Sequence, residues 1–240
     1  MQIFHSTLLN NYPNLMHCFT TKADSNLAFH VGDNKDNVDK NHSALAHKYC
    51  YDKKRLIHMQ QIHSNIVKVI DSDDSFVNPP TCDAIITNIK ETPLMVMVAD
   101  CSPVLFFDPK KEVIATAHAG RAGAFNNIVH NVIESFVSEF KSKPEDICVT
   151  IGPAICQKCY EINSDLAKEA KTLGFGASIK KKSEKYFLDI RSILKKELIE
   201  AGIRPQHLEI SQECSKCNPH YFSYREDEKC GRFGGVIYLR

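Results

Sequence analysis

Two short apolar stretches joined by a polar turn constrain the fold of this chain more than any other feature. Residues 104–107 read V-L-F-F and residues 113–117 read V-I-A-T-A, with D-P-K-K-E between them. Short apolar runs that are bounded by turn signals are typical of buried β-strands. Because a connection this short joins antiparallel neighbours, we expect a β-hairpin over residues 104–117.

A cysteine and a histidine stand at the open end of this hairpin. Cys101 comes just before the first arm and His118 just after the second. If the turn centres between Pro109 and Lys110, these two residues lie directly opposite each other, with Cβ atoms roughly 4.5–5.5 Å apart. That distance allows a thiolate and an imidazole to share a metal ion or a proton. Pro103 weakens the first arm, so the register could slip by one residue.

A metal ion at this place needs a further ligand, because a catalytic zinc ion has three protein ligands and one open position. The segment H-M-Q-Q-I-H-S-N contains His58 and His63, and His63 comes just before a strand-like segment. Strand ends in a mixed sheet gather at a common edge, so we expect His63 to be the third ligand. Structural roles stay open, since a lone histidine beside a strand is often structural and a buried cysteine often acts as a small hydrophobic residue.

The rest of the chain mixes strand-like and helix-like segments. Apolar residues recur with helical spacing over 124–140, which predicts the clearest helix. Intermixed strands and helices indicate an α/β or α+β class with a mixed sheet. With 240 residues the chain forms one large domain or two closely fused ones. Further strands are expected at 17–21, 65–70, 84–87, 94–99, 148–151 and 235–239, and further helices at about 36–49, 164–173 and 189–201, the last ending at Gly202.

Composition argues against several classes of partner. The chain is 43% hydrophobic and 25% charged with a formal net charge of +1, so we expect no nucleic-acid partner. The basic cluster at 180–185 is expected to be a solvated loop or helix end. No apolar run approaches the ~20 residues that span a bilayer, and the N-terminus does not resemble a signal peptide. A cytoplasmic, reducing location is therefore the default expectation, and the ten cysteines should be thiols or metal ligands.

Four of these cysteines form two C-x-x-C pairs, C156-Q-K-C159 and C214-S-K-C217. Two such pairs invite a structural zinc site, and with it a non-enzymatic interaction protein. However, the segment 160–213 between them is far longer than the ~15–20 residues of the usual zinc ribbon. A thioredoxin-like redox motif is disfavoured as well, because no helix signal begins right after either first cysteine.

Several phrases along the chain resemble the signature of one family. They run in order from about Phe19 to the C-terminus, and together they are similar to the polyphenol oxidoreductase or laccase-domain family. That family also carries the labels purine nucleoside phosphorylase and peptidoglycan editing factor. The phrases are Q61-I-H63-S, D83-A-I-I-T87, A99-D-C-S-P103-V-L-F-F-D108, A117-H-A-G120, G152-P-A-I155, Y160-E, F222-S-Y-R225 and G231-R232.

The resemblance implies a zinc ion bound by His63, Cys101 and His118, with the last two at the centre of catalysis. It implies a single domain built as a mixed β-sandwich surrounded by helices. The implied chemistry is the phosphorolysis of purine nucleosides, such as adenosine, inosine and methylthioadenosine, and the deamination of adenosine. Copper could replace zinc, since it stands higher in the affinity order. A multicopper oxidase is not expected, because the eleven histidines include no H-x-H pair and these ligands support one mononuclear site at most.

The chain departs from the family pattern next to the expected ligands. The usual H-A-G-W-R-G reads H118-A-G-R-A-G here, F-T-T-R ends in Lys22, and S-Y-R-R reads S-Y-R225-E. We assign Arg225 and Arg232 to substrate or phosphate binding, because arginine grips anions with two parallel hydrogen bonds. Lys22 and Arg121 are weaker candidates for the same role. Zinc would lower the pKa of bound water towards ~7 for deamination, with Asp100 as the nearest carboxylate to act as an acid.

Two other functions stay open at this point. Cys101 and His118 without a metal ion could act as nucleophile and base of a hydrolase, which would suit a cell-wall precursor as substrate. His63 discriminates between the two readings, because a zinc site needs a second histidine and a dyad does not. The interaction protein with a structural zinc ion is the other alternative. No nicotinamide, flavin or P-loop fingerprint is present in the sequence.

Overall fold

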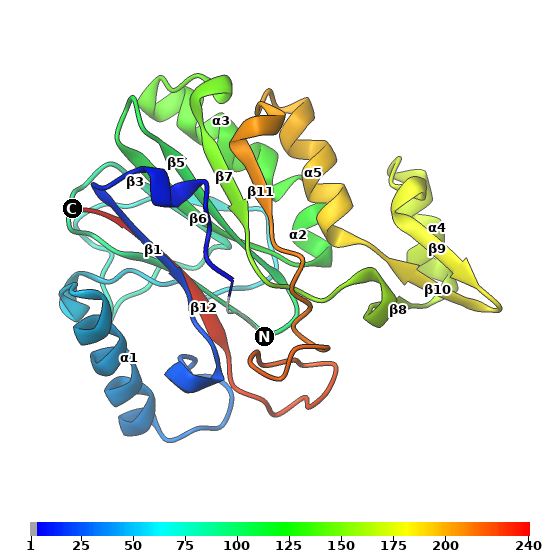
Figure 1. Ribbon diagram of the computed structural model, residues 1–240, viewed down its shortest axis with the longest axis horizontal. Helices are drawn as coiled ribbons and strands as arrows, with labels where there is room; N and C mark the ends of the chain where they lie inside the picture. The colour runs from blue at the N-terminus through cyan, green and yellow to red at the C-terminus, as the bar shows by residue number, and fades with distance from the viewer. Residues whose placement is uncertain (1–3) are drawn as a thin grey trace.

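The computed structural model describes residues 4–240, which form three β-sheets and five α-helices (Figure 1). The helices are α1 (Lys35–Tyr49), α2 (Arg121–Phe125), α3 (Ile128–Phe140), α4 (Ser164–Thr172) and α5 (Ile190–Glu200). The strands are β1 (Leu15–Phe19), β2 (Val67–Val69), β3 (Ala84–Thr87), β4 (Leu94–Val98), β5 (Ser102–Asp108), β6 (Val113–Ala119), β7 (Cys148–Ile151), β8 (Glu161–Ile162), β9 (Ile179–Lys182), β10 (Lys185–Leu188), β11 (Leu208–Ile210) and β12 (Phe233–Leu239).

Two of the sheets pack face to face at the centre of the molecule. The larger has the strand order β11-β7-β5-β6-β3-β2, in which β11–β7 and β2–β3 are parallel and the other pairs antiparallel. The smaller is antiparallel in the order β1-β12-β4, and its strands β4 and β12 contact β5 and β6. Helices α2, α3 and α5 cover the other face of the larger sheet (Figure 1). The mixed α/β fold with a sandwich core is therefore confirmed.

Strand β5 is buried on both of its faces and contributes to two apolar cores. Leu105 and Phe107 belong to the core between the two sheets. Val104 and Phe106 belong to the core between the larger sheet and the helices. A strand that is covered on both sides has no polar face, which is why this stretch of sequence reads as a continuous apolar run.

The predicted hairpin is present as β5 and β6, but its predicted register is wrong. Pro103, rather than Cys101, pairs with His118, so the turn centres between residues 110 and 111. Asp108 stabilises the turn of this register, because its Oδ1 accepts hydrogen bonds from the backbone N–H groups two and three residues further along, at 2.8 and 3.1 Å. Cys101 therefore lies two residues beyond the position opposite His118. A shift of two residues keeps a side chain on the same face of a sheet, so the two residues still meet.

The helix expected at 124–140 is two helices in the structure. α2 begins earlier, at Arg121, and α3 begins at Ile128. Asn127 between them has a left-handed backbone with a φ of 60°, a conformation that asparagine tolerates better than most residues. Apolar spacing continues across this break, so the sequence pattern gives no sign of it.

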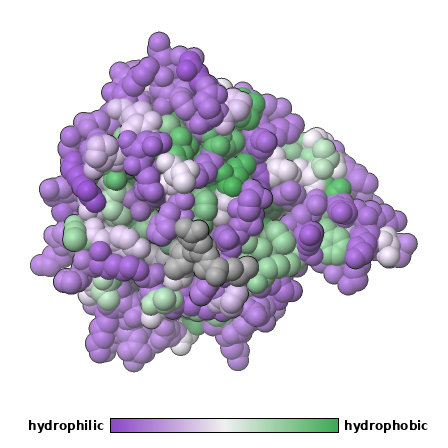
Figure 2. Space-filling view, viewed as in Figure 1, coloured by the Kyte–Doolittle hydropathy of each residue, from purple (hydrophilic) through white to green (hydrophobic). Residues whose placement is uncertain are grey.

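The basic segment 180–185 forms part of a third sheet rather than a loop or a helix end. This sheet has the order β8-β10-β9, and with α4 it projects to one side of the sandwich (Figure 1). The face of the molecule drawn in Figure 2 is mostly hydrophilic, and its hydrophobic residues lie in small groups, several of them near the middle of the view. No helix within residues 4–240 has the length and apolar character needed to cross a bilayer.

Candidate active site

The structure brings together the three residues expected to bind a metal ion. His63 lies in the loop before β2, Cys101 between β4 and β5, and His118 near the end of β6. One donor atom of each residue lies within 4.8 Å of the other two, and the two imidazole ring centres are 4.7 Å apart. His58, the alternative ligand, is not part of this group. Its Nε2 lies 3.0 Å from the carbonyl oxygen of Phe76 in a cluster of aromatic rings.

A buried carboxylate behind the three donors holds two of them in place. Asp83 is 0% exposed and accepts hydrogen bonds from the backbone N–H groups of Ile62 (3.2 Å), His63 (3.0 Å) and Ser64 (2.6 Å). The hydroxyl of Ser64 donates to it as well, at 2.7 Å. Its Oδ1 also lies 2.8 Å from Nδ1 of His118. A histidine that donates from Nδ1 to a carboxylate keeps its Nε2 lone pair for a metal ion.

The charges of the group favour a cysteine thiolate. Burial alone would raise the pKa of Cys101, but the charge of His118 and hydrogen bonds from His118 and His63 lower it below the usual range. Burial alone would lower the pKa of His118, whereas Cys101 and Asp83 raise it. Burial would likewise raise the pKa of Asp83, and its hydrogen bonds with His118 and Ser64 lower it to about 2. The thiolate is the form of cysteine that binds metal ions and that acts as a nucleophile.

The backbone is strained at two non-glycine residues of the site. His63 has a φ of 59° and Asp100 a φ of 87°, and each such conformation costs about 1–3 kcal/mol, which surrounding contacts must offset. Asp83 holds the first through the N–H of His63. The carboxylate of Asp100 accepts hydrogen bonds from the hydroxyl of Ser215 (2.6 Å) and the N–H of Arg225 (2.8 Å). Asp100, expected as an acid, thus binds the loop that carries Arg225.

A glycine leaves room for the cysteine sulfur. A Cβ atom at Gly120 would lie 2.8 Å from Sγ of Cys101 and 3.4 Å from Cδ2 of His63. Any other residue here would displace the thiol from the two imidazoles. One sulfur and two imidazole nitrogens suit zinc, and they suit copper as well. The residues present therefore fit a single transition-metal ion.

The three donors line a cavity of about 500 Å³ that also holds the arginines expected to bind substrate. Arg121, Arg225 and Arg232 all line it, but Lys22 does not. The ammonium group of Lys22 lies 5.7 Å from the ring centre of Phe222 instead. Three of the four cationic candidates therefore share one cavity with the three candidate metal ligands.

Each of the two arginines from the C-terminal segment lies against an aromatic ring of the cavity. The Arg225 guanidinium is 4.8 Å from the ring centre of Tyr160, and its Nη1 donates to the carbonyl of Glu161 (3.0 Å). The Arg232 guanidinium is 5.9 Å from the ring centre of Tyr224. Cation–π contacts of this kind hold a guanidinium in place while several of its N–H groups remain available to an anion.

Sequence reasoning missed several residues of the site. Asp83 and Tyr160 stand in the phrases that carry the family resemblance. The resemblance points to these two positions, but the sequence does not indicate what their side chains do. Gln61 also lines the cavity and exchanges two hydrogen bonds with the backbone of Met97, at 2.7 and 2.9 Å. His30 lines it too, from a turn-rich segment that gives no functional signal. Burial lowers the pKa of His30, so its imidazole is neutral at pH 7.

Comparison with known proteins finds relatives that match most of the chain. A purine nucleoside phosphorylase of Corynebacterium glutamicum is 34% identical over 220 residues, which cover 90% of this chain and 87% of that protein. A purine nucleoside phosphorylase of Streptomyces coelicolor is 31% identical over 214 residues, which cover 89% of this chain and 87% of that protein.

Solved structures with the same fold are also known. The crystal structure of YlmD from Geobacillus stearothermophilus has a TM-score of 0.90 at 24% identity and covers 98% of this chain and 94% of its own. The Bacillus licheniformis protein YfiH has a TM-score of 0.88 at 25% identity and covers 94% and 93%. Residues 18–240 match the family described as multi-copper polyphenol oxidoreductase laccase. This chain, with its His–Cys–His group at the mouth of a central hairpin, belongs to that family.

Proposed function

We propose that this chain is a metal-dependent purine nucleoside phosphorylase that also deaminates adenosine, and that it works as a single catalytic domain. The observation that carries the proposal is the placement of a three-donor metal group and three arginines in one cavity. Two relatives that match most of the chain are named purine nucleoside phosphorylases. A cavity of about 500 Å³ is within the range of small-molecule sites.

Phosphorolysis joins two substrates with different needs. A phosphate oxygen attacks C1′ of the ribose, the bond from C1′ to the purine nitrogen breaks, and the purine keeps the electron pair and takes up a proton. We assign phosphate binding to Arg225 and Arg232, with Arg121 beside them, because guanidinium groups bind phosphate oxygens in pairs. We assign purine stacking to the ring of Tyr224 and a hydrogen bond with the base to the neutral imidazole of His30.

The metal ion would be held by His63, Cys101 and His118. Zinc is the proposed ion, with copper as a substitute. When bound, such an ion supplies Lewis acidity to an oxygen or nitrogen of the substrate. Asp83 keeps the imidazole of His118 in one tautomer and one orientation. Deamination in the same cavity would replace the amino group at C6 of adenosine with an oxygen from water and release ammonia.

One observation favours a second function, a cysteine hydrolase. Without a metal ion, the lowered pKa of Cys101 and the raised pKa of His118 favour the thiolate–imidazolium pair that a nucleophilic cysteine needs. The position of His63 favours the metal site, because a Cys–His pair does not need a second imidazole within reach of the sulfur. The two functions predict different results when the metal ion is removed. Removal should abolish phosphorolysis, whereas it should leave the thiol of a cysteine hydrolase reactive.

The test is to incubate the zinc-loaded protein with adenosine, with and without phosphate, and to separate the products. We expect adenine and ribose 1-phosphate when phosphate is present and inosine in either condition. We expect Cys101→Ser, His63→Ala and His118→Ala to lose at least 100-fold in rate along with their bound zinc. A zinc-loaded protein that yields neither adenine nor inosine would disprove the proposal. Rapid alkylation of Cys101 in the metal-free wild type, together with amide or ester hydrolysis, would establish the cysteine hydrolase instead.

The four cationic candidates allow a matched comparison. We expect Arg225→Ala to raise the KM for phosphate about 10- to 150-fold, since a hydrogen bond to a charged group contributes about 1.5–3 kcal/mol. Lys22→Ala also removes a positive charge, but Lys22 lies outside the cavity. The KM of this variant for phosphate should therefore stay within twofold of the wild-type value. Steady-state phosphorolysis at varied phosphate measures both. Equal KM values for the two variants would remove Arg225 from the phosphate site.

A further inference from the structure

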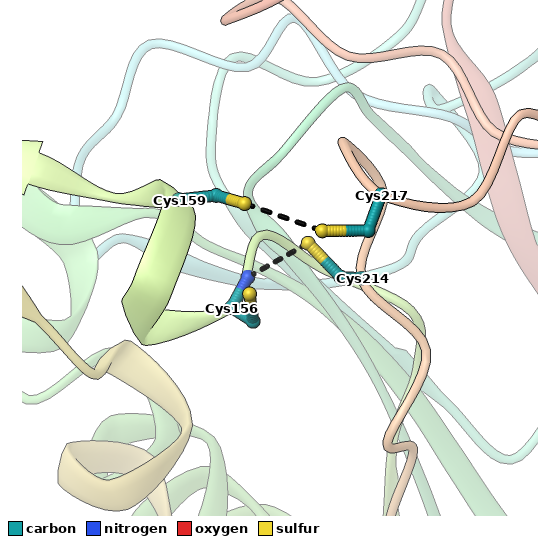
Figure 3. A group of neighbouring side chains, drawn as sticks. All are labelled: Cys156, Cys159, Cys214 and Cys217. Carbon is teal, nitrogen blue, oxygen red and sulfur yellow. Dashed lines mark hydrogen bonds between the residues drawn. The ribbon is translucent and has the colours of Figure 1, made fainter.

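The described residues contain a second group of metal-type ligands, apart from the active site. It consists of the two C-x-x-C pairs, Cys156 with Cys159 and Cys214 with Cys217. Their four sulfur atoms all lie within 4.8 Å of one another. Figure 3 shows the four side chains pointing toward one another from two separate segments of the chain. Nothing in the proposed reaction uses these thiols.

The fold brings the pairs together although residues 160–213 lie between them. Ala154, two residues before the first pair, forms a parallel β-bridge with Cys214 of the second pair, and the N–H of Ser215 donates to the carbonyl of Ala154 at 3.1 Å. The buried guanidinium of Arg191 donates to the carbonyls of both segments, at Ala154 and Glu213. The long separation in sequence is thus no obstacle to a shared site, because the two backbones are already joined here.

The size of the group matches a tetrahedral metal site. Four sulfurs about 2.3 Å from one zinc ion lie ~3.8 Å from one another, and C-x-x-C is the spacing that supplies two such ligands. Sγ of Cys159 and Sγ of Cys217 are 3.3 Å apart. The N–H of Cys156 donates to Sγ of Cys214 at 3.2 Å, a bond that stabilises a thiolate. A disulfide would join two of the sulfurs and leave two others packed against it.

The charges around the four cysteines also suit a zinc ion. Four thiolates with one Zn²⁺ carry a net charge of −2. Lys158 lies within the first pair and Lys216 within the second, and both line surface hollows that these cysteines also line. Arg191 lines one of these hollows as well. The cations that line the two hollows outnumber the carboxylates there, Glu161 and Asp189, and this excess of positive charge lowers the energy of a doubly negative centre.

We propose that Cys156, Cys159, Cys214 and Cys217 bind a structural zinc ion that fastens residues 154–162 to residues 211–225. The first segment carries Tyr160 and the second carries Arg225, which together form one wall of the active-site cavity. Their cation–π contact and the hydrogen bond from Arg225 to Glu161 join the same two segments. The zinc ion therefore fixes the distance between two loop segments that no long strand supports.

Elemental mass spectrometry of the full-length protein tests this site independently of activity. We expect about two zinc ions per chain in the wild type. The triple variant H63A/C101S/H118A should keep one, and the double variant C156S/C217S should lose one. Cys50→Ser replaces an exposed cysteine outside the group and should keep both. A triple variant with no zinc, iron in place of zinc, or an intact-mass loss of two hydrogens that reports a disulfide would each overturn the proposal.

Hydrogen exchange supplies a second readout in case the double variant is poorly folded. Removal of the thiolate-bound zinc from the triple variant with a strong chelator should increase exchange at least tenfold within 154–162 and 211–225. Exchange within β5 and β6 should not change. An equal increase in all four segments, or no increase in any, would contradict the fastening role. Because the triple variant lacks the active-site ligands, neither result depends on the proposed reaction.

Discussion

An Asp83→Ala variant is expected to bind its active-site metal ion about 10- to 100-fold more weakly than the wild type. That range is typical for loss of a carboxylate that orients a ligating histidine. Asp83 accepts five hydrogen bonds, among them those from the backbone of His63 and from Nδ1 of His118. Without it, both imidazoles lose the group that fixes their direction. Competition with a chromophoric chelator measures the affinity.

The same variant is expected to lose about 3–5 kcal/mol of unfolding free energy, as when one partner of a buried ion pair is removed. Urea unfolding in the presence of chelator measures this loss without a contribution from the metal. Asp108→Ala is the matched control, since Asp108 is a buried carboxylate that caps the turn at the far end of the same hairpin. It should destabilise the protein and leave metal affinity unchanged. Wild-type metal affinity in Asp83→Ala would refute the orienting role.

A Glu197→Gln variant is expected to be more stable than the wild type at pH 7 by about 3 kcal/mol. Glu197 lies in α5 with 5% exposure, and neither carboxylate oxygen has a hydrogen-bond partner. Burial raises its pKa from 4.5 to about 8, with smaller effects from Lys196 and Glu200. The folded state therefore keeps a proton that the unfolded state releases. Stability from this group is full below pH 4.5 and is lost as the pH rises towards 8.

Urea unfolding at pH 5 and at pH 8 measures this effect. The gain from Glu197→Gln should be small at pH 5 and largest at pH 8, because the free-energy cost of keeping Glu197 protonated in the folded state grows as the pH rises above 4.5. Glu200→Gln is the control, since Glu200 is an exposed neighbour on the same helix that forms an ion pair with Lys196. Its stability should stay within about 0.5 kcal/mol of the wild type. An equal gain from Glu197→Gln at both pH values would show that the charge is not the cause.

The central hairpin and the three donors could be predicted because their signals are local. Apolar runs bounded by turn residues reveal buried strands, and a cysteine and a histidine at strand ends mark a shared edge. The exact pairing could not be predicted, because the side chain of Asp108 closes a longer turn. The prediction of proximity survived, since the shift of two residues kept both side chains on one face.

Other parts of the molecule depend on contacts that sequence spacing does not show. The role of Asp83 depends on its contacts with the segments that carry His63 and His118. In the sequence alone, Asp83 is a polar residue before a strand. Strands β8 to β11 are two to four residues long and partly exposed, so they carry little hydrophobic pattern. The number of residues between the two C-x-x-C pairs argues against a shared zinc site, but that number does not determine how far apart the pairs lie in space.

The active site is assembled from two kinds of structure, and this has a consequence for how its specificity can change. His118 in β6 and Asp83 directly before β3 are buried in the larger sheet, and the carboxylate of Asp83 holds the backbone of His63 against that sheet. Tyr160, Arg225 and Arg232 stand on loops outside that sheet, and the departures from the family pattern at Lys22, Arg121 and Glu226 also leave the three donors intact. We therefore expect that loops grafted from a relative would change the substrate preference of this chain and leave the His–Cys–His group in place.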